Sequence, residues 1–355
     1  MPPPRGLVQQ VDHFLHRRQL LGRGQRLLVA CSGGADSVGL LRLLHAVNGS
    51  EYWGWKLVVG HVDHQLRGRA SAGDAAFVRQ LAKRLGLAFV CLKVKVPRTP
   101  EGFASEAAAR QSRYAALAAL ARRRKCAAIV VGHHAEDQAE TILLKILRGC
   151  GLRGLAGMAQ KTRAHGVPVV RPLLWVRRAE LRAFLAEQAQ KWREDASNRS
   201  PFYLRNRVRT EILPVLEGVQ PRVVELLIRL AANARMAEGL LEPATQRALA
   251  RAIVSKPRGA MVLNRVLLRK LPLELRRRVL RAALLACGVP ADRIDFEQLL
   301  AATRHLRKGP GKKVQLVFGG GVAMWIEREA VVVGRRGEKK RRHGDAAARR
   351  HGGET

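Results

Sequence analysis

The sequence is short of acidic side chains. Its 355 residues include 28 Asp and Glu against 65 Lys and Arg, which leaves a formal net charge of +37. A surplus of this size attracts polyanions or anionic membranes at neutral pH. Nucleic acid is the partner that we expect.

Cysteine pairs and long apolar runs are also missing. The five cysteines form no C-x-x-C pair, which excludes a zinc knuckle and a redox dithiol. No stretch of about 18 or more uncharged apolar residues occurs, and the charged segment 12–18 stands where a signal peptide would have its apolar core. We expect a soluble, cytoplasmic protein with buried, reduced thiols and no membrane partner.

The first half of the chain alternates short apolar runs with amphipathic helical patterns, as a parallel α/β sheet requires. Strands are predicted at residues 26–31, 56–62, 87–96, 127–132 and 167–174. Helices are predicted between them, at residues 35–44, 72–85, 105–123 and 136–147. The expected fold is α/β, with a doubly wound, parallel, five-stranded sheet.

The pattern changes after about residue 200, where prolines interrupt the chain and arginine-rich helical segments follow. A helix is predicted at 272–287, with its arginines opposite the apolar face: Arg276, Arg277, Arg278 and Arg281. These arginines are either a solvated surface or an RNA-facing one. Residues 313–318 and 322–327 predict a β-hairpin around three glycines, and 330–333 a third strand.

Three parts are therefore expected along the chain. An α/β domain covers 1–205, and a smaller, mainly helical domain with a β-hairpin covers 206–334. The stretch 335–355 is basic and almost free of apolar residues, so a disordered tail is expected there.

The loop 32–37, Ser-Gly-Gly-Ala-Asp-Ser, lies between the first strand and a helix. Its glycines let an anion approach the backbone, and the amides of the helix start and two serine hydroxyls can bind phosphate. Asp36 is expected to hold Mg²⁺ against the phosphates, since a carboxylate repels phosphate itself. The motif is not a Walker A loop, because no lysine follows the glycines. A plain Gly-Gly turn with Asp36 at the helix start is the structural alternative.

This loop resembles the PP-loop of the ATP pyrophosphatases, which have an adenine nucleotide α-hydrolase-like fold and cleave ATP to AMP and pyrophosphate. The resemblance implies adenylate chemistry and an ATP-binding set made of Ser32, Gly33, Gly34, Ala35, Asp36 and Ser37. The loop alone indicates the reaction class but not the substrate, because it is shared by tRNA-lysidine synthetases, tRNA thiolases, GMP synthetases and asparagine synthetases.

Two histidine-containing blocks follow strand ends, at 61–67 and 132–141. In a doubly wound sheet the ligand lies at the carboxyl ends of strands where the strand order reverses, so both blocks are expected at one crevice with the loop. Asp137 and Glu140 are three residues apart on a helix and share a face, which suits them to bind a cationic group or a metal. A metal-hydrolase site built from His133, His134 and the adjacent acids is an alternative.

Several arginines recur at regular spacing. The helix 105–123 carries a stripe that suits either phosphate contact or ordinary salt bridging, made of Glu106, Arg110, Arg113 and Tyr114. Three arginines at alternate positions suit a segment that contacts an RNA backbone: Arg205, Arg207 and Arg209. Trp175 and Trp192 are expected to be packed rather than stacked on bases.

In chain order these blocks read H-x-D-H-x-L-R, E-x-x-x-A-R-x-x-R-Y, G-H-H-x-x-D-Q-x-E-T, R-P-L-L and W-x-x-D-x-S-N. Together they resemble the tRNA(Ile)-lysidine synthetase family over about residues 20–215. The resemblance implies a catalytic domain at 1–205 and a tRNA-binding domain at 206–334. It adds His61 to the ATP site and implies tRNA contacts by Arg67, Arg110, Arg113, Arg205, Arg207 and Arg209. It is compatible with a homodimer.

The resemblance also implies a two-step reaction on the wobble cytidine of a CAU-anticodon tRNA(Ile), which converts AUG reading to AUA reading. Cytosine O2 attacks the α-phosphate of ATP, and the ε-amine of free lysine then displaces AMP from C2. Asp36, Asp137, Glu140 and His133 are the expected catalytic residues. Asp137 and Glu140 would bind the lysine ammonium, and His133 would handle its proton.

Other functions stay open at this stage. A tRNA thiolase of the same fold would use the same loop, but the chain lacks the cysteine pair that its sulfur chemistry needs. A glutamine-dependent amidotransferase would need a glutaminase domain, for which the chain has no room. A protein that only binds RNA, with the loop as a nucleotide sensor, is equally compatible with the charge.

Overall fold

The structure is a computed structural model and describes residues 6–63, 69–94, 106–194, 204–307 and 313–335. The chain divides into two compact units, Met1–Arg235 and Met236–Thr355. The boundary falls inside α10 (Val223–Ala252). The domain limits predicted from the sequence stay a prediction, and all of the predicted tail but Arg335 lies outside the described residues.

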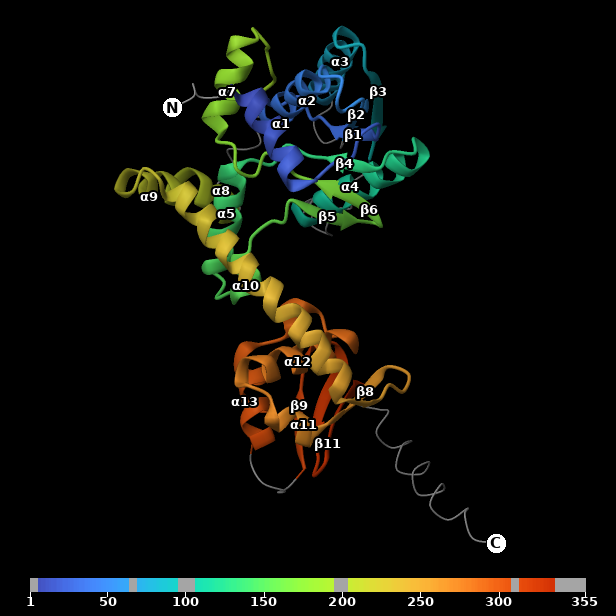
Figure 1. The fold of residues 1–355 in the computed structure, drawn as a ribbon, viewed down its shortest axis with the longest axis vertical. Helices are drawn as coiled ribbons and strands as arrows, with labels where there is room; N and C mark the ends of the chain where they lie inside the picture. Colours follow the sequence, from blue (N-terminus) through green and yellow to red (C-terminus); the bar gives the residue numbers. More distant parts are fainter. Residues whose placement is uncertain (1–5, 64–68, 95–105, 195–203, 308–312, 336–355) are drawn as a thin grey trace. The chain divides into compact units, whose positions relative to one another are not determined.

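The first unit carries a six-stranded sheet in the order β3-β2-β1-β4-β6-β5 (Figure 1). Its strands are β1 (Arg26–Ala30), β2 (Lys56–Asp63), β3 (Ala88–Lys93), β4 (Ala128–Val130), β5 (Lys161–Ala164) and β6 (Val167–Val170). Five of them pair in parallel, and β5 pairs antiparallel with β6. The predicted doubly wound parallel sheet is confirmed, with β1 and β4 adjacent where the order reverses.

Strand β5 is the sixth strand that the sequence analysis missed. It has only four residues, and none of them is fully buried. Its hairpin turns through His165 and Gly166, both at positive φ (47° and 82°), which suits a tight two-residue turn. A short polar edge strand has too little apolar patterning to be recognised in a sequence.

Helices cover both faces of the sheet, and β1 shows why. Leu27 and Val29 point into one hydrophobic core with α1, α2, α3 and α7, whereas Leu28 points into the other with α4. Alternating side chains of this one strand thus pack against the helices on the two faces of the sheet. The helices are α1 (Leu7–Arg18), α2 (Ala35–Asn48), α3 (Arg69–Arg84), α4 (Glu106–Arg123), α5 (Ala135–Ile146), α6 (Leu152–Leu155), α7 (Arg178–Glu187), α8 (Leu204–Arg207), the π-helix η2 (Val208–Ile212) and α9 (Leu213–Val219).

The second unit has an antiparallel sheet in the order β7-β8-β11-β10-β9, so the predicted hairpin and third strand are part of a larger sheet. Its strands are β7 (Ile253–Ser255), β8 (Ala260–Asn264), β9 (Val314–Val317), β10 (Val322–Ile326) and β11 (Ala330–Arg335). Its helices are α11 (Arg265–Lys270), α12 (Leu273–Ala286), η3 (Ala291–Arg293), α13 (Phe296–Arg307) and η4 (Gly319–Gly321). Strand β7 was missed because it directly follows a long helix without a turn signal in between, and β8, which pairs with it, was missed as well.

The predicted arginine face of α12 is wrong for Arg276. This side chain is 6% exposed. Its Nε donates to the Leu268 carbonyl at 3.0 Å, and its Nη2 donates to the carbonyls of Arg269 and Leu271 at 2.8 Å each. Arg276 therefore caps the carboxyl end of α11, where carbonyl groups lack helical partners.

Replacing Arg276 by alanine is expected to destabilise the second unit by about 2–4 kcal/mol, because three carbonyls lose a charged donor. Urea unfolding of the whole chain measures the change. Arg247→Ala, at an exposed arginine of α10, is the matched control and should change stability by less than about 0.5 kcal/mol. Equal effects of the two substitutions would contradict the capping role.

No helix in the described ranges combines the length and the apolar character needed to cross a membrane. All five cysteines are free thiols, as predicted, but the expected burial holds only for Cys31, and the other four are partly exposed. Burial raises the pKa of the Cys31 thiol, beside the loop, to about 11, so this group is protonated and unreactive at neutral pH.

Candidate active site

The loop 32–37 connects the end of β1 to the first turn of α2, as predicted. The Ser37 hydroxyl accepts hydrogen bonds from the amides of Ser32 (3.1 Å) and Gly33 (3.2 Å) and donates to the Gly34 carbonyl (3.0 Å). Two amides thus converge on one oxygen atom, which is the arrangement that binds a phosphate oxygen. Gly33 has φ +101°, a conformation that favours glycine.

The loop is packed against the end of β4 through Gly132. A Cβ atom at Gly132 would lie 2.7 Å from the carbonyl oxygen of Asp36. Glycine is therefore required just after β4, where the chain passes the first turn of α2. This close approach brings the block 132–141 next to the loop 32–37.

A cavity of about 420 Å³ opens at this edge of the sheet. Its volume is within the range of small-molecule sites. The predicted site residues in its wall are Ser32, Gly34, Asp36, Ser37, Arg113, His133, Asp137 and Arg209. The carboxyl ends of β1 and β4 thus hold the loop, a histidine, two acids and two arginines around one space, at the expected switch point.

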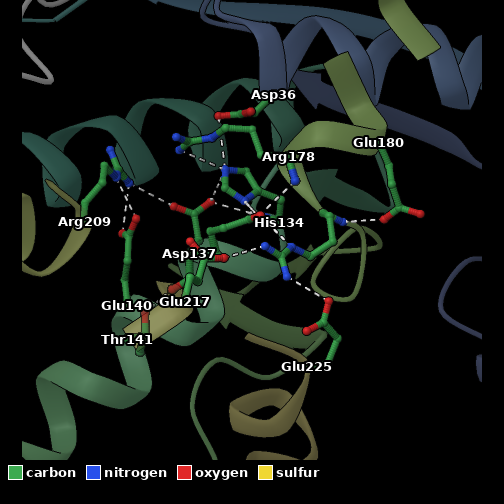
Figure 2. A network of polar contacts seen from close by, with 12 residues as sticks. Asp36, His134, Asp137, Glu140, Thr141, Arg178, Glu180, Arg209, Glu217 and Glu225 are labelled. Atoms are coloured by element: carbon green, nitrogen blue, oxygen red, sulfur yellow. Dashed lines mark hydrogen bonds and ion pairs between the residues drawn. The ribbon is translucent and has the colours of Figure 1, made fainter. Parts of the chain in front are cut away.

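His134, which the sequence analysis weighed only for a metal hydrolase, lies at the centre of this site (Figure 2). The ring is fully buried. Its Nε2 lies 3.4 Å from Asp36 Oδ2 and 3.5 Å from Asp137 Oδ2, and its Nδ1 lies 2.9 Å from Glu136 Oε2.

These carboxylates set the charge of His134. Burial lowers its pKa, but Asp137, Asp36 and Glu136 outweigh burial and raise the pKa from 6.5 to about 10. Arg178 Nη2, 3.3 Å from the same Nε2, opposes protonation, but one guanidinium does not balance three carboxylates. The imidazole is therefore a cation at neutral pH.

The raised pKa of His134 predicts a pH-dependent stability. An unfolded histidine loses its proton near pH 6.5, so the contribution of His134 is complete below about pH 6.5 and is lost as the pH rises towards about 10. The stability difference between the wild type and His134→Gln should therefore shrink from pH 7 to pH 10. Urea unfolding without nucleotide at several pH values measures it, and a constant difference would contradict the assignment.

His133 lies beside this cluster and behaves differently. Burial lowers its pKa to about 3, and the nearby Arg171, Arg110 and Arg113 act in the same direction. Its Nδ1 has no hydrogen-bond partner among the described residues. The ring is thus neutral and lines the cavity, but it is a weak base, and its role in proton handling stays a prediction.

Asp137 and Glu140 share a face of α5, as predicted, and both contact arginines. Glu140, which is buried below the cavity wall, accepts hydrogen bonds from Arg205 Nε (3.0 Å), Arg209 Nε (2.6 Å) and Arg209 Nη2 (2.9 Å). Asp137 Oδ1 lies 3.4 Å from Arg205 Nη2 and 3.3 Å from Arg209 Nη2. Lysine binding by these two acids stays a prediction, and it requires the two arginines to give up contacts.

The three arginines at alternate positions do not form an extended segment. They lie in α8 and η2, where residues four apart share a face. Arg205 and Arg209 therefore reach the acids of α5, whereas Arg207 pairs with the exposed Glu211 at 3.1 Å. Their roles in tRNA binding stay predictions.

The remaining predicted residues lie near the cavity without lining it, or outside the description. His61 is buried, and its Nδ1 lies 2.9 Å from the Cys31 carbonyl, where it supports the loop from β2. Arg110 lies over the Tyr114 ring, 5.6 Å from its centroid, on the same helix as Arg113. Arg67 lies outside the described residues. Trp175 and Trp192 pack against the core, as predicted.

Four further charged residues of the cavity wall were not predicted: Asp74, Arg178, Arg193 and Glu194. The Arg193 amide donates to the Gly33 carbonyl at 2.9 Å, and its Nε donates to Asp74 Oδ1 at 3.1 Å. Arg193 and Glu194 lie inside the W-x-x-D-x-S-N block that starts at Trp192, so the sequence could have indicated them. Nothing in the sequence marks Arg178 or Asp74, since only the fold brings them to the loop.

Asp36 is the residue that could hold a metal ion. Its Oδ2 faces His134, and its Oδ1 is buried without a hydrogen-bond partner among the described residues. Within that part of the chain no cluster of three or more protein ligands occurs. This combination fits Mg²⁺, which one or two carboxylates and the phosphates of a nucleotide commonly hold.

Known proteins are similar to almost the whole chain. A PP-loop domain family matches residues 6–216, and a TilS substrate binding domain family matches residues 263–353. A tRNA(Ile)-lysidine synthase of Geobacter sulfurreducens is 35% identical over 319 residues, which are 89% of this chain and 67% of the relative. One from Nostoc sp. is 33% identical over 348 residues, 94% and 98% of the two chains. The chain covers 61% of a Geobacillus kaustophilus relative that is 34% identical.

Among solved structures, the U34-tRNA thiolase NcsA from Methanococcus maripaludis, described with its [4Fe-4S] cluster, superposes with a TM-score of 0.53 at 17% identity. The match covers 64% of this chain and 78% of the thiolase. At this identity the likeness shows a common fold and nothing about the substrate.

Proposed function

The chain belongs to the tRNA(Ile)-lysidine synthase family, and we propose that it ligates free lysine to C2 of the wobble cytidine in tRNA(Ile) with a CAU anticodon. The resemblance inferred from the sequence motifs is thereby confirmed. The chain is an ATP-using enzyme of tRNA modification. The observation that carries the proposal is the cavity, whose wall holds both the PP-loop and Asp137.

The first step would activate the cytidine. Cytosine O2 forms a bond to the α-phosphorus of ATP, and the bond from that phosphorus to the β-phosphate oxygen breaks, which releases pyrophosphate. The Ser32 and Ser37 hydroxyls and the cavity arginines Arg113, Arg178 and Arg193 are suited to hold the phosphates. Mg²⁺ bound at Asp36 would neutralise charge on the departing pyrophosphate.

The second step would replace AMP by lysine. The ε-amine, after losing a proton, forms a bond to C2, and the C2–O bond to AMP breaks. Asp137, whose pKa is about 2 because His134, His133 and the two arginines outweigh burial, is anionic at neutral pH and suited to bind the lysine ammonium. Glu140 lies beside it on α5.

Incorporation of [¹⁴C]lysine into RNA tests the proposal. The complete chain, ATP, Mg²⁺ and an unmodified CAU-anticodon tRNA(Ile) transcript should give labelled RNA, and omission of ATP should abolish the label. A folded protein that gives no label would contradict the lysidine function. An RNA-binding nucleotide sensor would bind both ligands and release no tRNA-dependent pyrophosphate.

A homodimer and a cytoplasmic location stay predictions. The tRNA thiolase is the weaker candidate, because the likeness to the thiolase shows the fold alone and the chain has no C-x-x-C pair. No described feature favours the amidotransferase or the metal hydrolase over the ligase.

A further inference from the structure

Two acids from separate elements meet at one buried ring. Asp36 belongs to the first turn of α2 and Asp137 to the first turn of α5, and both reach His134 Nε2 through their Oδ2 atoms, at 3.4 and 3.5 Å (Figure 2). Carboxylates that approach each other repel, and the repulsion is strong where water is excluded. The imidazole lies where it relieves this repulsion.

The ring is held from its other side by a second set of contacts. Its Nδ1 lies 2.9 Å from Glu136 Oε2, which also accepts a hydrogen bond from the Arg178 amide at 3.0 Å. Glu136 Oε1 accepts from Arg177 Nε at 2.8 Å. With Nδ1–H donating to Glu136, the orientation of the ring is fixed, and Nε2 must point at the two aspartates.

Arg177 anchors this set in the fold. Besides Glu136, its guanidinium donates to Glu217 of α9 at 2.6 Å and to Glu225 of α10 at 2.8 Å. The chain of contacts therefore runs from α9 and α10 through Arg177 and Glu136 to the ring. Rotation of any of these three side chains would break a hydrogen bond between charged groups.

The contact to His134 also decides how Asp36 faces the cavity. Because Oδ2 points to the ring, Oδ1 is left without a hydrogen-bond partner among the described residues, in a side chain that lines the cavity. We propose that His134 is a positioning residue for Asp36, which holds that carboxylate in the orientation in which it binds a divalent cation beside the nucleotide phosphates. The inference deepens the proposed function and rests on it.

A purely structural role for His134 would have a different signature. The residue precedes the first turn of α5, and its own amide donates to Asp137 Oδ2 at 3.1 Å. This helix-start contact uses the backbone, so any residue at position 134 keeps it. The ring contacts to Asp36, Asp137 and Glu136 depend on the side chain, so substitutions can separate them from the helix-start contact.

Three substitutions of His134 test which ring nitrogen matters, because each keeps a different set of its hydrogen-bond donors. In His134→Gln the amide nitrogen lies near the place of Nε2 and can still reach the aspartates, whereas in His134→Asn it lies near Nδ1 and reaches only Glu136. His134→Ala removes both contacts. His45→Gln, at a half-buried histidine later in α2, is the matched control.

The measurement is binding of Mn²⁺, as a paramagnetic substitute for Mg²⁺, in the presence of α,β-methylene-ATP, followed by EPR. Changes in residues that orient a metal ligand typically weaken metal binding about 10–100-fold. We expect a loss of this size in His134→Asn and His134→Ala, a loss below about 5-fold in His134→Gln, and no change in His45→Gln. Glu136→Gln, which loosens the ring from the far side, should fall between the wild type and His134→Ala.

Thermal unfolding without nucleotide and tRNA-dependent pyrophosphate release accompany the titration. If folded His134→Asn and Glu136→Gln bind Mn²⁺ as tightly as the wild type, or if His134→Gln is as impaired as His134→Asn, the positioning role is wrong. If His134 variants fail to fold, Glu136→Gln alone decides between these outcomes. If the wild type releases pyrophosphate normally, these results contradict the positioning role alone and leave the proposed function unaffected. If it binds no Mn²⁺ with the analogue and releases none, the proposed function fails, and the inference with it.

Discussion

Replacing Asp36 by alanine should lower tRNA-dependent pyrophosphate release by about 10²–10³-fold while tRNA binding stays within about 2-fold of the wild type. Asp36 lines the cavity and has one oxygen without a hydrogen-bond partner among the described residues, so its loss would remove the proposed ligand of a metal ion next to the phosphates. Under the proposed function, phosphate contacts of basic side chains would supply most of the tRNA affinity, and the substitution leaves these side chains in place.

A continuous pyrophosphate assay and filter binding of tRNA at a fixed salt concentration measure the two effects separately. Asp36→Asn, which keeps the shape of the side chain, should lose nearly as much activity as the alanine variant. Glu187→Gln at the exposed end of α7 is the control for removal of one negative charge, and its activity should be unchanged. Loss of pyrophosphate release and tRNA binding together would contradict this division of roles.

The position of the PP-loop could be predicted from the sequence because its determinants are local. An apolar run, two glycines and an amphipathic helix define a strand end followed by a helix start, and parallel strands bring such ends to one edge of a sheet. The same argument correctly placed the start of α5 beside Asp36. Gly132 makes this contact possible, since a Cβ atom there would meet the Asp36 carbonyl.

The choice between His133 and His134 could not be predicted in this way. The two residues are adjacent, and neighbouring side chains near a strand end point in different directions. Which of them is surrounded by carboxylates depends on how α2, α5 and α7 pack, and only the structure shows that it is His134. The sequence analysis chose His133 for catalysis, and the structure gives it a low pKa and a place beside the cluster.

The arginines near residue 205 show a second limit. Their alternate spacing was interpreted as a segment that contacts an RNA backbone with all three arginines, but a helical segment groups Arg205 with Arg209 and separates Arg207. Periodicity over a few residues does not distinguish these cases when every other residue is charged. The pairing with Glu140 is a long-range contact, which no local pattern contains.

Replacing Glu140 by glutamine should uncouple the two steps of the proposed reaction. Glu140 is fully buried and does not line the cavity, so ATP binding and pyrophosphate release should stay within about 3-fold of the wild type. Lysine transfer should fall by about 10²–10³-fold, because removal of one partner of a buried charge pair costs about 3–5 kcal/mol. Adenylated tRNA would then accumulate.

The substitution also removes a carboxylate partner from two partly buried guanidinium groups, and this effect must be separated from loss of lysine binding. Arg205 and Arg209 each donate to Glu140, so the single variant should unfold more easily than the wild type. The double variant Glu140→Gln/Arg209→Gln removes one of the two unpaired charges. It should recover much of the stability and none of the lysine transfer.

Parallel measurements of [¹⁴C]lysine incorporation, pyrophosphate release and thermal unfolding test this expectation. Glu211→Gln is the matched control, because Glu211 pairs with Arg207 in the same segment at the protein surface, and it should change neither step by more than about 2-fold. If the double variant folds and incorporates lysine with the saturation behaviour of the wild type, Glu140 does not bind the amine. Its role would then be structural, through the two arginine contacts that join α8 and η2 to α5.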